Sequence, residues 1–319
     1  MSNCLICTLE TASDTEYHPK CAKKLFESNT VPEIHYNLSD LHKLASQIVK
    51  QKVTIPGVQA KMSMEIQKQA DRHAKMTITG LWGRFILKPP SDRWDQLPEN
   101  EHCTLSLAAA AGIDTVPFGL IRLLSGELSF ISRRIDRGAD GKKIAMEDMC
   151  QLTQRLTEDK YKGSQEQIAR VINQYSANPG FDLTRYYELV LFCYLTGNGD
   201  MHLKNFSMIN DLKVGWKLAE AYDLLNTRLV IPAKVDPEEL ALTIAGKKNN
   251  FNHYVFTVFG QKIGLNDKQV NNAILNLRKK IPTLKKVINK SFLSTEMKSQ
   301  YLSVITQRSS GLFDSGLNI

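Results

Sequence analysis

An apolar segment that runs directly into a polar turn is the feature that most constrains the fold of this chain. Residues 186–195 are apolar nearly all round, as expected of a helix that is buried on every side. This segment leads into the turn Gly197-Asn198-Gly199-Asp200-Met201-His202-Leu203-Lys204-Asn205-Phe206. A rigid helix at this point would aim the polar side chains of the turn, above all Asp200, into a cleft.

The polar residues of this turn have the spacing of a phosphotransferase catalytic loop. In such a loop an Asp takes the proton of the acceptor hydroxyl, and an Asn holds a metal ion on the nucleotide phosphates. Asp200 is therefore a candidate catalytic base and Asn205 a candidate Mg²⁺ ligand, while His202 could contact phosphate or brace the loop. The alternative is an ordinary turn, because Gly, Asn and Asp are among the commonest turn residues.

A second carboxylate follows at a suitable distance along the chain. Asp223 lies 18 residues after Asn205, and a predicted hairpin of residues 206–208 and 215–218 would return the chain to the neighbourhood of the loop. A kinase has its second metal-binding Asp at this point, although Leu224-Leu225 replaces the usual Phe-Gly. Taken alone, Asp223 could equally be a helix N-cap.

A lysine suited to nucleotide phosphates precedes the loop in the sequence. Lys88 ends the predicted strand of residues 84–88, and Glu99 or Glu101 in the following helix could pair with it. The alternatives are an edge lysine that guards a strand against pairing and glutamates that favour the helix dipole.

The candidate phosphate loop precedes the first predicted strand and contains a single glycine, a poor match to Gly-x-Gly-x-x-Gly. Its residues are Pro56, Gly57, Val58 and Gln59. Loop, lysine, glutamate helix, Asp–Asn turn and second Asp nevertheless occur in the order of a kinase, and this order favours a kinase over a set of unrelated turns.

Strand patterns dominate the first half of the chain and helix patterns the second half. We therefore expect an α+β fold with a small β-rich N-lobe and a larger α-helical C-lobe, connected near residues 136–141. The predicted strands are residues 58–66, 76–78, 85–87, 120–124 and 128–131, with hairpin turns at 80–83 and 125–127. The predicted helices are residues 101–111, 146–155, 164–175, 186–195, 267–280 and 295–307.

Composition sets broad limits on location and partners. Of 319 residues, 42% are hydrophobic and 23% charged, which suits a globular protein. The longest apolar run, residues 189–195, is far too short to span a bilayer, and no secretory signal pattern opens the chain, so we expect a cytoplasmic protein. The net charge of +8 permits an anionic partner. Arg278-Lys279-Lys280 and Lys285-Lys286 predict a solvated helix face, with direct nucleic-acid contact as the alternative.

Three of the six cysteines are concentrated near the N-terminus with one histidine. Cys4, Cys7, His18 and Cys21 have residue types and spacing that suit tetrahedral Zn²⁺. The alternative is a set of reduced thiols and a surface histidine. Such a site could stabilise an otherwise weak N-terminal segment, residues 1–30.

The same residues resemble a known family, the HipA-like kinases, which are toxins of bacterial toxin–antitoxin systems. The matching pieces lie between positions 55 and 248 of this sequence. They are Ile55-Pro56-Gly57-Val58-Gln59-Ala60-Lys61, Phe85-Ile86-Leu87-Lys88-Pro89, Glu99-Asn100-Glu101, Glu147-Asp148-Met149-Cys150-Gln151, Gly199-Asp200-Met201-His202-Leu203-Lys204-Asn205-Phe206 and Ala241-Leu242-Thr243-Ile244-Ala245-Gly246-Lys247-Lys248.

The resemblance implies a bilobed protein-kinase-like fold, with an N-lobe at residues 31–137 and a C-lobe at 138–319, and Ser/Thr phosphorylation with Mg-ATP. It implies Asp200 as the base, Asn205 and Asp223 as Mg²⁺ ligands, and phosphate contacts from Lys88 and His202. Further residues are implied by the same resemblance: adenine contacts from the backbone of Arg133 and Ile135, and autophosphorylation at Thr54.

The chain is similar to the HipT type, in which an N-terminal piece of HipA is a separate small protein. The implied partners are a HipS-like protein and a HipB-like DNA-binding antitoxin, with DNA reached only through the antitoxin. The implied substrate is an aminoacyl-tRNA synthetase, the tryptophanyl enzyme for the HipT type. The alternative is a kinase-like pseudoenzyme that acts as a binding subunit of an antitoxin–DNA complex.

Overall fold

The structure is a computed structural model that describes residues 2–12, 15–51, 60–68, 74–80, 82–138 and 140–313, with the backbone alone at 45–51. The chain forms two compact units. The first comprises residues 1–103, 116–142 and 290–293, and the second comprises residues 104–115, 143–289 and 294–319. The first contains a six-stranded sheet, and the second contains a three-stranded sheet among helices.

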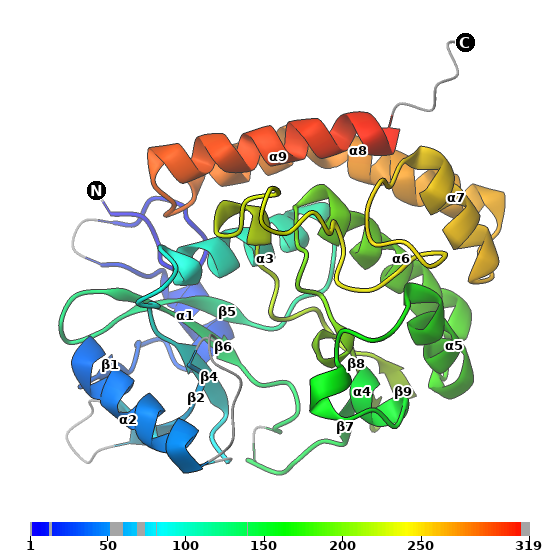
Figure 1. The fold of residues 1–319 in the computed structure, drawn as a ribbon. Coiled ribbons are helices and arrows are strands. Elements are labelled where there is room, and N and C mark those ends of the chain that lie inside the picture. Colours follow the sequence, from blue (N-terminus) through cyan, green and yellow to red (C-terminus); the bar gives the residue numbers. More distant parts are fainter. Residues whose placement is uncertain are drawn as a thin grey trace. The chain divides into compact units, whose positions relative to one another are not determined.

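The sheet of the first unit is antiparallel except for one pair of strands (Figure 1). Its order is β1-β3-β2-β4-β6-β5, in which only β1 and β3 run parallel. The elements are α1 (Pro19–Phe26), β1 (Glu33–Ile34), α2 (Leu38–Gln51), β2 (Met62–Lys68), β3 (Ala74–Ile78), β4 (Phe85–Lys88), the start of α3 (Leu97–Ala111), β5 (Phe118–Arg122) and β6 (Leu128–Arg133). Since β5 is the last strand of the sheet, its outer backbone groups need partners from elsewhere.

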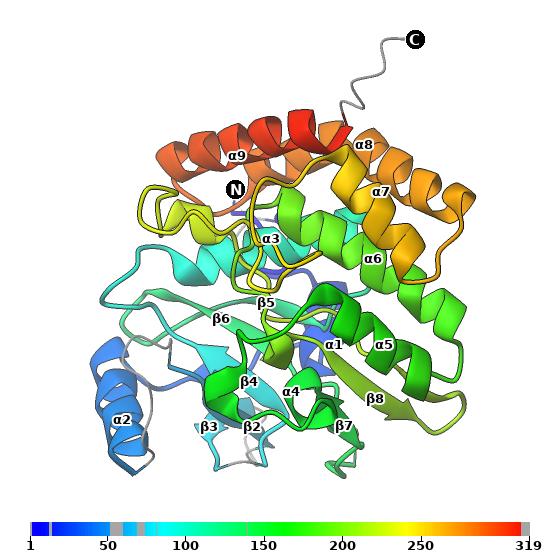
Figure 2. The same ribbon diagram turned by 45° about the vertical axis from the view of Figure 1, so that its right-hand side comes forward.

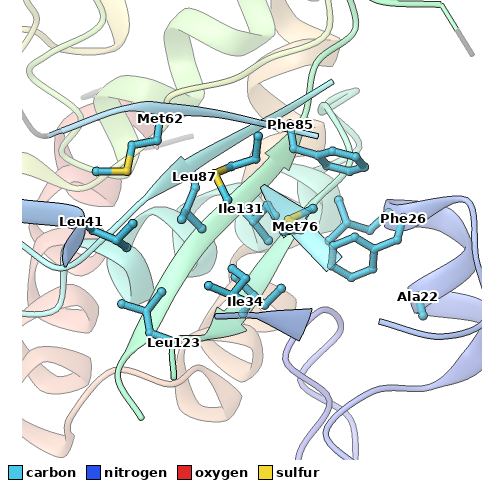
Figure 3. Packing of buried hydrophobic residues seen from close by; sticks show 13 residues of the cluster. Ala22, Phe26, Ile34, Leu41, Met62, Met76, Phe85, Leu87, Leu123 and Ile131 are labelled. Atoms are coloured by element: carbon cyan, nitrogen blue, oxygen red, sulfur yellow. The ribbon is translucent and has the colours of Figure 1, made fainter. Parts of the chain in front are cut away.

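A cluster of buried apolar side chains joins this sheet to α1 and α2 (Figure 3). Phe85 and Leu87 of β4 are fully buried in the cluster together with Ile131 of β6. Side chains alternate between the two faces of a strand, so Lys88 lies on the face of β4 opposite to Leu87. The apolar packing of one face thus fixes the direction of the lysine on the other.

Two predictions about these strands are settled by the sheet order. The hairpin of residues 120–124 and 128–131 is confirmed, because β5 and β6 pair across a turn in which Gly126 has a φ of +100°. The hairpin of residues 76–78 and 85–87 is wrong, because β2 lies between β3 and β4 and pairs with both. The chain passes so close to β2 that a Cβ on Gly83 would lie 2.4 Å from the carbonyl oxygen of Met64.

The strand predicted at residues 58–66 is observed as β2, which begins at Met62 and continues to Lys68. Residues 58 and 59 lie outside the described residues. The sequence pattern therefore gave the right element with a start too early.

Helices surround α6 (Pro179–Leu195) in the second unit. α5 (Gln165–Tyr175) and α9 (Thr295–Phe313) pack against α6, and α7 (His253–Lys262) packs against α9. Both views show α8 (Asp267–Lys290) running beside α9 (Figures 1 and 2). The remaining elements are β7 (Met146–Asp148), α4 (Met149–Leu152), β8 (Ser207–Asp211) and β9 (Gly215–Leu218), whose strands form the antiparallel sheet β7-β8-β9.

Most predicted helices are present and longer than expected, since α3, α6, α8 and α9 each extend beyond the predicted range. The helix predicted at residues 146–155 is wrong. Residues 146–148 pair with β8 instead, and a short helix begins only after Asp148, which forms a capping box with Gln151. The capping signal was present in the sequence, but the pairing with β8, 59 to 63 residues later, was not readable from it.

No helix in the described part of the chain is long and apolar enough to cross a membrane. The basic residues that the sequence placed on a solvated face are exposed on α8. They are Arg278, Lys279, Lys280, Lys285 and Lys286.

His102 is a buried titratable group in the first unit. It is completely buried in α3, its Nε2 lies 3.0 Å from the carbonyl oxygen of Ile6, and Phe118 and Phe292 contact it edge-on. Burial lowers its pKa from 6.5 to about 4, although the contact with the Ile6 carbonyl opposes this shift. The imidazole is therefore neutral in the folded protein near pH 7.

We predict that Leu87→Ala destabilises the first unit by about 2–5 kcal/mol, because it leaves a cavity in a fully buried cluster. Chemical denaturation followed by circular dichroism measures the change. Leu124→Ala is the matched control, because Leu124 is exposed and its loss should change the unfolding free energy by less than about 0.5 kcal/mol. Equal effects of the two substitutions would contradict the packing described for β4.

We also predict that acid destabilises the first unit through His102. The unfolded chain takes up this proton near pH 6.5 and the folded chain only near pH 4, so stability is lost as the pH falls between these values. The loss should approach about 3 kcal/mol. Denaturation curves of wild type and His102→Gln between pH 7 and 4 measure it, and the variant should lose less stability. His35→Gln is the control: it removes only an exposed ion pair with Glu33 and should change the pH-dependent loss by less than about 1 kcal/mol.

Candidate active site

The turn after α6 is fixed by hydrogen bonds to Thr227. Its Oγ1 donates to the carbonyl of Gly197 and accepts from the N–H of Gly199, both at 3.0 Å. Gly197 has a φ of +69°, and a Cβ there would lie 2.9 Å from Oδ1 of Asn226, so only glycine fits. Asn198 is fully buried, and its N–H donates to the carbonyl of Cys193 in the last turn of α6.

Asp200 follows directly and is half-buried. The hydroxyl of Tyr161 donates to its Oδ1 at 2.6 Å, and the side chain of Asn198 accepts from its backbone N–H. The carbonyl of Asp200 accepts from the N–H of His202 at 2.8 Å and from Nδ2 of Asn205 at 3.0 Å. The three polar residues of the predicted loop thus lie on one hydrogen-bonded turn.

His202 is buried beside Tyr161, with the two ring centroids 5.0 Å apart. Burial lowers the pKa of His202 and the charge of Lys160 acts in the same direction, while the carboxylates of Asp200 and Asp223 oppose them. The net shift is downward, which favours a neutral imidazole. Its Nδ1 is buried without a hydrogen-bond partner among the residues that the structure describes, which marks a polar atom available to a ligand.

Asp223 is brought back to this turn by the β8–β9 hairpin, which confirms the hairpin predicted there. Burial raises the pKa of Tyr161, and the negative charges of Asp200 and Asp223 raise it further. Asp223 has a φ of +58°, a left-handed conformation that is uncommon outside glycine. The hydroxyl of Tyr222, bonded to Ser207 and to the carbonyl of Lys204, anchors the preceding residue.

Lys88 forms a buried ion pair in the first unit. Its Nζ donates to both carboxylate oxygens of Glu101, at 2.6 and 2.7 Å, and lies 5.3 Å from the centre of the Phe130 ring. Both charged side chains are almost entirely inaccessible to water. Of the two glutamates considered from the sequence, the structure pairs Glu101 with Lys88. Glu99 is a separate group whose pKa is raised by burial.

The two residues expected to contact adenine lie at and just after the end of β6. The N–H of Arg133 donates to the carbonyl of Pro117 at 2.8 Å, and its guanidinium pairs with Glu27. A backbone contact from Arg133 to a base would therefore have to use its carbonyl. Ile135 follows in a turn and is half-buried.

The candidate phosphate loop and the candidate phosphorylation site lie outside the described residues. They are Thr54, Pro56, Gly57, Val58 and Gln59.

The N-terminal cysteines and histidine converge in the first unit. One ligand atom from each of Cys4, Cys7, His18 and Cys21 lies within 4.8 Å of the other three. All six cysteines of the chain are free thiols. The arrangement has the donor set of a metal centre, as the spacing predicted.

Sequence reasoning missed two residues that shape the turn, Tyr161 and Thr227. Tyr161 stands in a polar stretch with glycine nearby, and Thr227 begins a short 3₁₀ turn after Asn226. Neither position carries a periodic or motif signal, because their roles depend on contacts across 39 and 28 residues.

Similar proteins were found by sequence. A relative from Haemophilus influenzae, named "Putative kinase", is 28% identical over 271 residues, which cover 76% of each chain. "Putative kinase Y4mE" from Sinorhizobium fredii is 32% identical over 184 residues, 55% of this chain and 43% of that protein. The chain thus spans less than half the length of the Sinorhizobium relative.

Two solved structures share the fold. HipA of Shewanella oneidensis MR-1, in a complex with HipB and operator DNA, matches with a TM-score of 0.66 at 19% identity, over 81% of this chain and 64% of that one. The Helicobacter pylori proinflammatory kinase CtkA matches with a TM-score of 0.54 at 14% identity, over 72% of this chain and 88% of that one. At these identities the likeness concerns the fold alone.

The family model for the HipA-like C-terminal domain matches residues 53–284, a range that contains the predicted phosphate loop, Lys88 and the turn after α6. The family resemblance seen in the sequence is thereby confirmed. Because the match takes in well over half of the chain, this protein belongs to the HipA-like C-terminal domain family.

Proposed function

We propose that this chain is an ATP-dependent serine/threonine protein kinase, the toxin of a bacterial toxin–antitoxin system. The observation that carries the proposal is the hydrogen-bonded turn that holds Asp200, His202 and Asn205 together, to which the hydroxyl of Tyr222 ties the residue before Asp223. Phosphoryl transfer needs a carboxylate for the acceptor proton and further oxygens for metal ions, and this turn offers both. Membership in the HipA-like family supports the same function.

Asp200 is the proposed base. Its Oδ1 already accepts one hydrogen bond from a hydroxyl group, that of Tyr161, and an acceptor Ser or Thr hydroxyl would offer the same type of donor. The raised pKa of Tyr161 keeps the phenol protonated, so it donates to the carboxylate and does not compete with it for protons. The bonds from His202 and Asn205 to the Asp200 carbonyl hold the residue in place.

Asn205 and Asp223 are the proposed Mg²⁺ ligands. Nδ2 of Asn205 is engaged with Asp200, so Oδ1 is the remaining polar atom of the amide, and carboxylate and amide oxygens suit a hard cation. Bound Mg²⁺ would neutralise negative charge on the phosphates of ATP. His202, neutral and with Nδ1 unsatisfied among the described residues, would contact a phosphate oxygen.

Lys88 is the proposed contact to the α- and β-phosphates, with Glu101 holding its ammonium group in position. The phosphate loop of Pro56, Gly57, Val58 and Gln59, the adenine contacts of Arg133 and Ile135, and phosphorylation of Thr54 belong to the same proposal. A phosphate on Thr54 would add negative charge close to the nucleotide's own phosphates and so lower activity.

The proposed domains are a β-rich N-lobe at residues 31–137 and a C-lobe at 138–319. The proposed partners are a HipS-like small protein and a HipB-like DNA-binding antitoxin, and the complex of the Shewanella relative with HipB and operator DNA supports the latter. The proposed substrate is an aminoacyl-tRNA synthetase.

We predict that Asp200→Asn lowers the rate of phosphoryl transfer by about 10²–10⁴-fold, because it removes the base and keeps the shape of the side chain. Incubation with radiolabelled ATP and Mg²⁺, followed by measurement of label on the protein, tests this. Asp211→Asn, in the hairpin of the same unit, is the matched control and should label like wild type. Equal labelling of wild type and Asp200→Asn would overturn the assignment of the base, and an unlabelled wild type would favour the pseudoenzyme.

We predict that Glu101→Gln raises the KM for ATP and destabilises the first unit by about 3–5 kcal/mol, because Lys88 stays buried without its counter-charge. Labelling rates over a range of ATP concentrations and chemical denaturation measure the two effects. Glu127→Gln, at an exposed turn, should change neither. A folded Glu101→Gln variant with an unchanged KM for ATP would contradict the role given to the pair.

A further inference from the structure

Three thiols and one imidazole from the N-terminal segment point at a common centre. Nδ1 of His18 lies 3.3 Å from Sγ of Cys7 and 3.9 Å from Sγ of Cys21, and all four ligand atoms lie within 4.8 Å of one another. A disulfide would use two of the sulfurs and leave the third thiol and the imidazole unexplained. A single tetrahedral cation uses all four donors.

The hydrogen bond of His18 Nε2 favours metal binding at the other ring nitrogen, Nδ1. Its Nε2 lies 2.9 Å from the carbonyl oxygen of Glu10, which can only accept, so Nε2 carries the hydrogen. The lone pair of a neutral ring then lies on Nδ1, which faces the sulfurs. Ligating histidines in metal sites donate their other N–H to a carbonyl or carboxylate in this manner.

We propose that Cys4, Cys7, His18 and Cys21 bind one Zn²⁺ as a structural site. Thiolate and imidazole ligands select Zn²⁺ over the Mg²⁺ of a phosphoryl-transfer centre, and four protein ligands close the coordination sphere. On binding, the three thiols release their protons to water and their sulfurs each form one bond to the metal. The proposal does not depend on the kinase function.

The metal would hold the N-terminal loop against β5, an edge strand of the first unit's sheet. β5 ends this sheet, and the outward backbone groups of Leu120 are both satisfied from the N-terminal segment: the N–H donates to the carbonyl of Leu5, and the carbonyl accepts from the hydroxyl of Tyr17. Leu5 lies between Cys4 and Cys7, and Tyr17 precedes His18. Both residues that cover this strand therefore lie between zinc ligands in the sequence.

The same loop reaches α3. The carbonyl of Ile6 lies 3.0 Å from Nε2 of His102, which follows Glu101 in the helix. A Cβ on Gly119 would lie 2.7 Å from the side chain of Ile6, so the loop sits directly against the strand. Zinc would thus hold a loop that contacts both β5 and the helix that carries the partner of Lys88.

Metal content is the first test. The full chain, purified without chelator, is analysed by inductively coupled plasma mass spectrometry, and about one equivalent of zinc per chain is expected. Cys21→Ser should lose the zinc, whereas Cys150→Ser, which removes a buried cysteine of α4, should keep it. Zinc far below one equivalent in wild type even after incubation with Zn²⁺ would overturn the proposal, as would one equivalent of iron.

Two measurements keep the test decisive if Cys21→Ser does not fold. Co²⁺ added to the zinc-free wild-type chain should give the visible absorption of tetrahedral thiolate coordination, and its absence would overturn the site. Hydrogen exchange followed by mass spectrometry should show faster exchange in residues 118–122 after zinc removal, with the β8–β9 hairpin unchanged. Unchanged exchange in 118–122 would overturn the role in covering β5, and neither readout requires kinase activity.

Discussion

Helix α6 ends inside the second unit, where water does not reach its last turn, and the protein itself has to satisfy the backbone groups there. Thr196 and Asn198 are fully buried, and the hydroxyl of Thr196 donates to the carbonyl of Phe192. Thr227 then satisfies Gly197 and Gly199 from a distant part of the chain. Hydrogen bonds therefore fix the turn before the chain reaches Asp200. The position of the candidate base follows from the way in which the buried helix ends.

The first unit contains a charged side chain, Lys88, that is buried away from water. Lys88 follows two strand residues that pack into the apolar cluster, and the alternation of the strand sends its side chain to the other face. Desolvating an ammonium group is costly, and Glu101 compensates for part of this cost through two short hydrogen bonds. Such a pair contributes little to stability compared with apolar packing. Its presence is better explained by the phosphate contact proposed for Lys88.

Local patterns in the sequence predicted much of this, because they report on interactions between near neighbours. The apolar residues of α6, the helix predicted at residues 164–175 and the turn at Gly126 are all of this kind, and each was correctly interpreted. The pairing of β2 between β3 and β4 was missed, since strand order depends on contacts that no short segment encodes. For the same reason Asp200 could be named as a candidate from its spacing to Asn205, whereas Tyr161, which bonds to it, could not.

The left-handed backbone of Asp223 restricts this position independently of its charge. Gly, Asn and Asp adopt that conformation more readily than other residues, so a Glu, which carries the same carboxylate, would fit this position less well. Among the residues that favour this backbone conformation, only Asp brings a negative charge. Substitution by Asn or Gly would keep the shape of the turn while removing the carboxylate, so the negative charge at this position can be lost without a loss of stability.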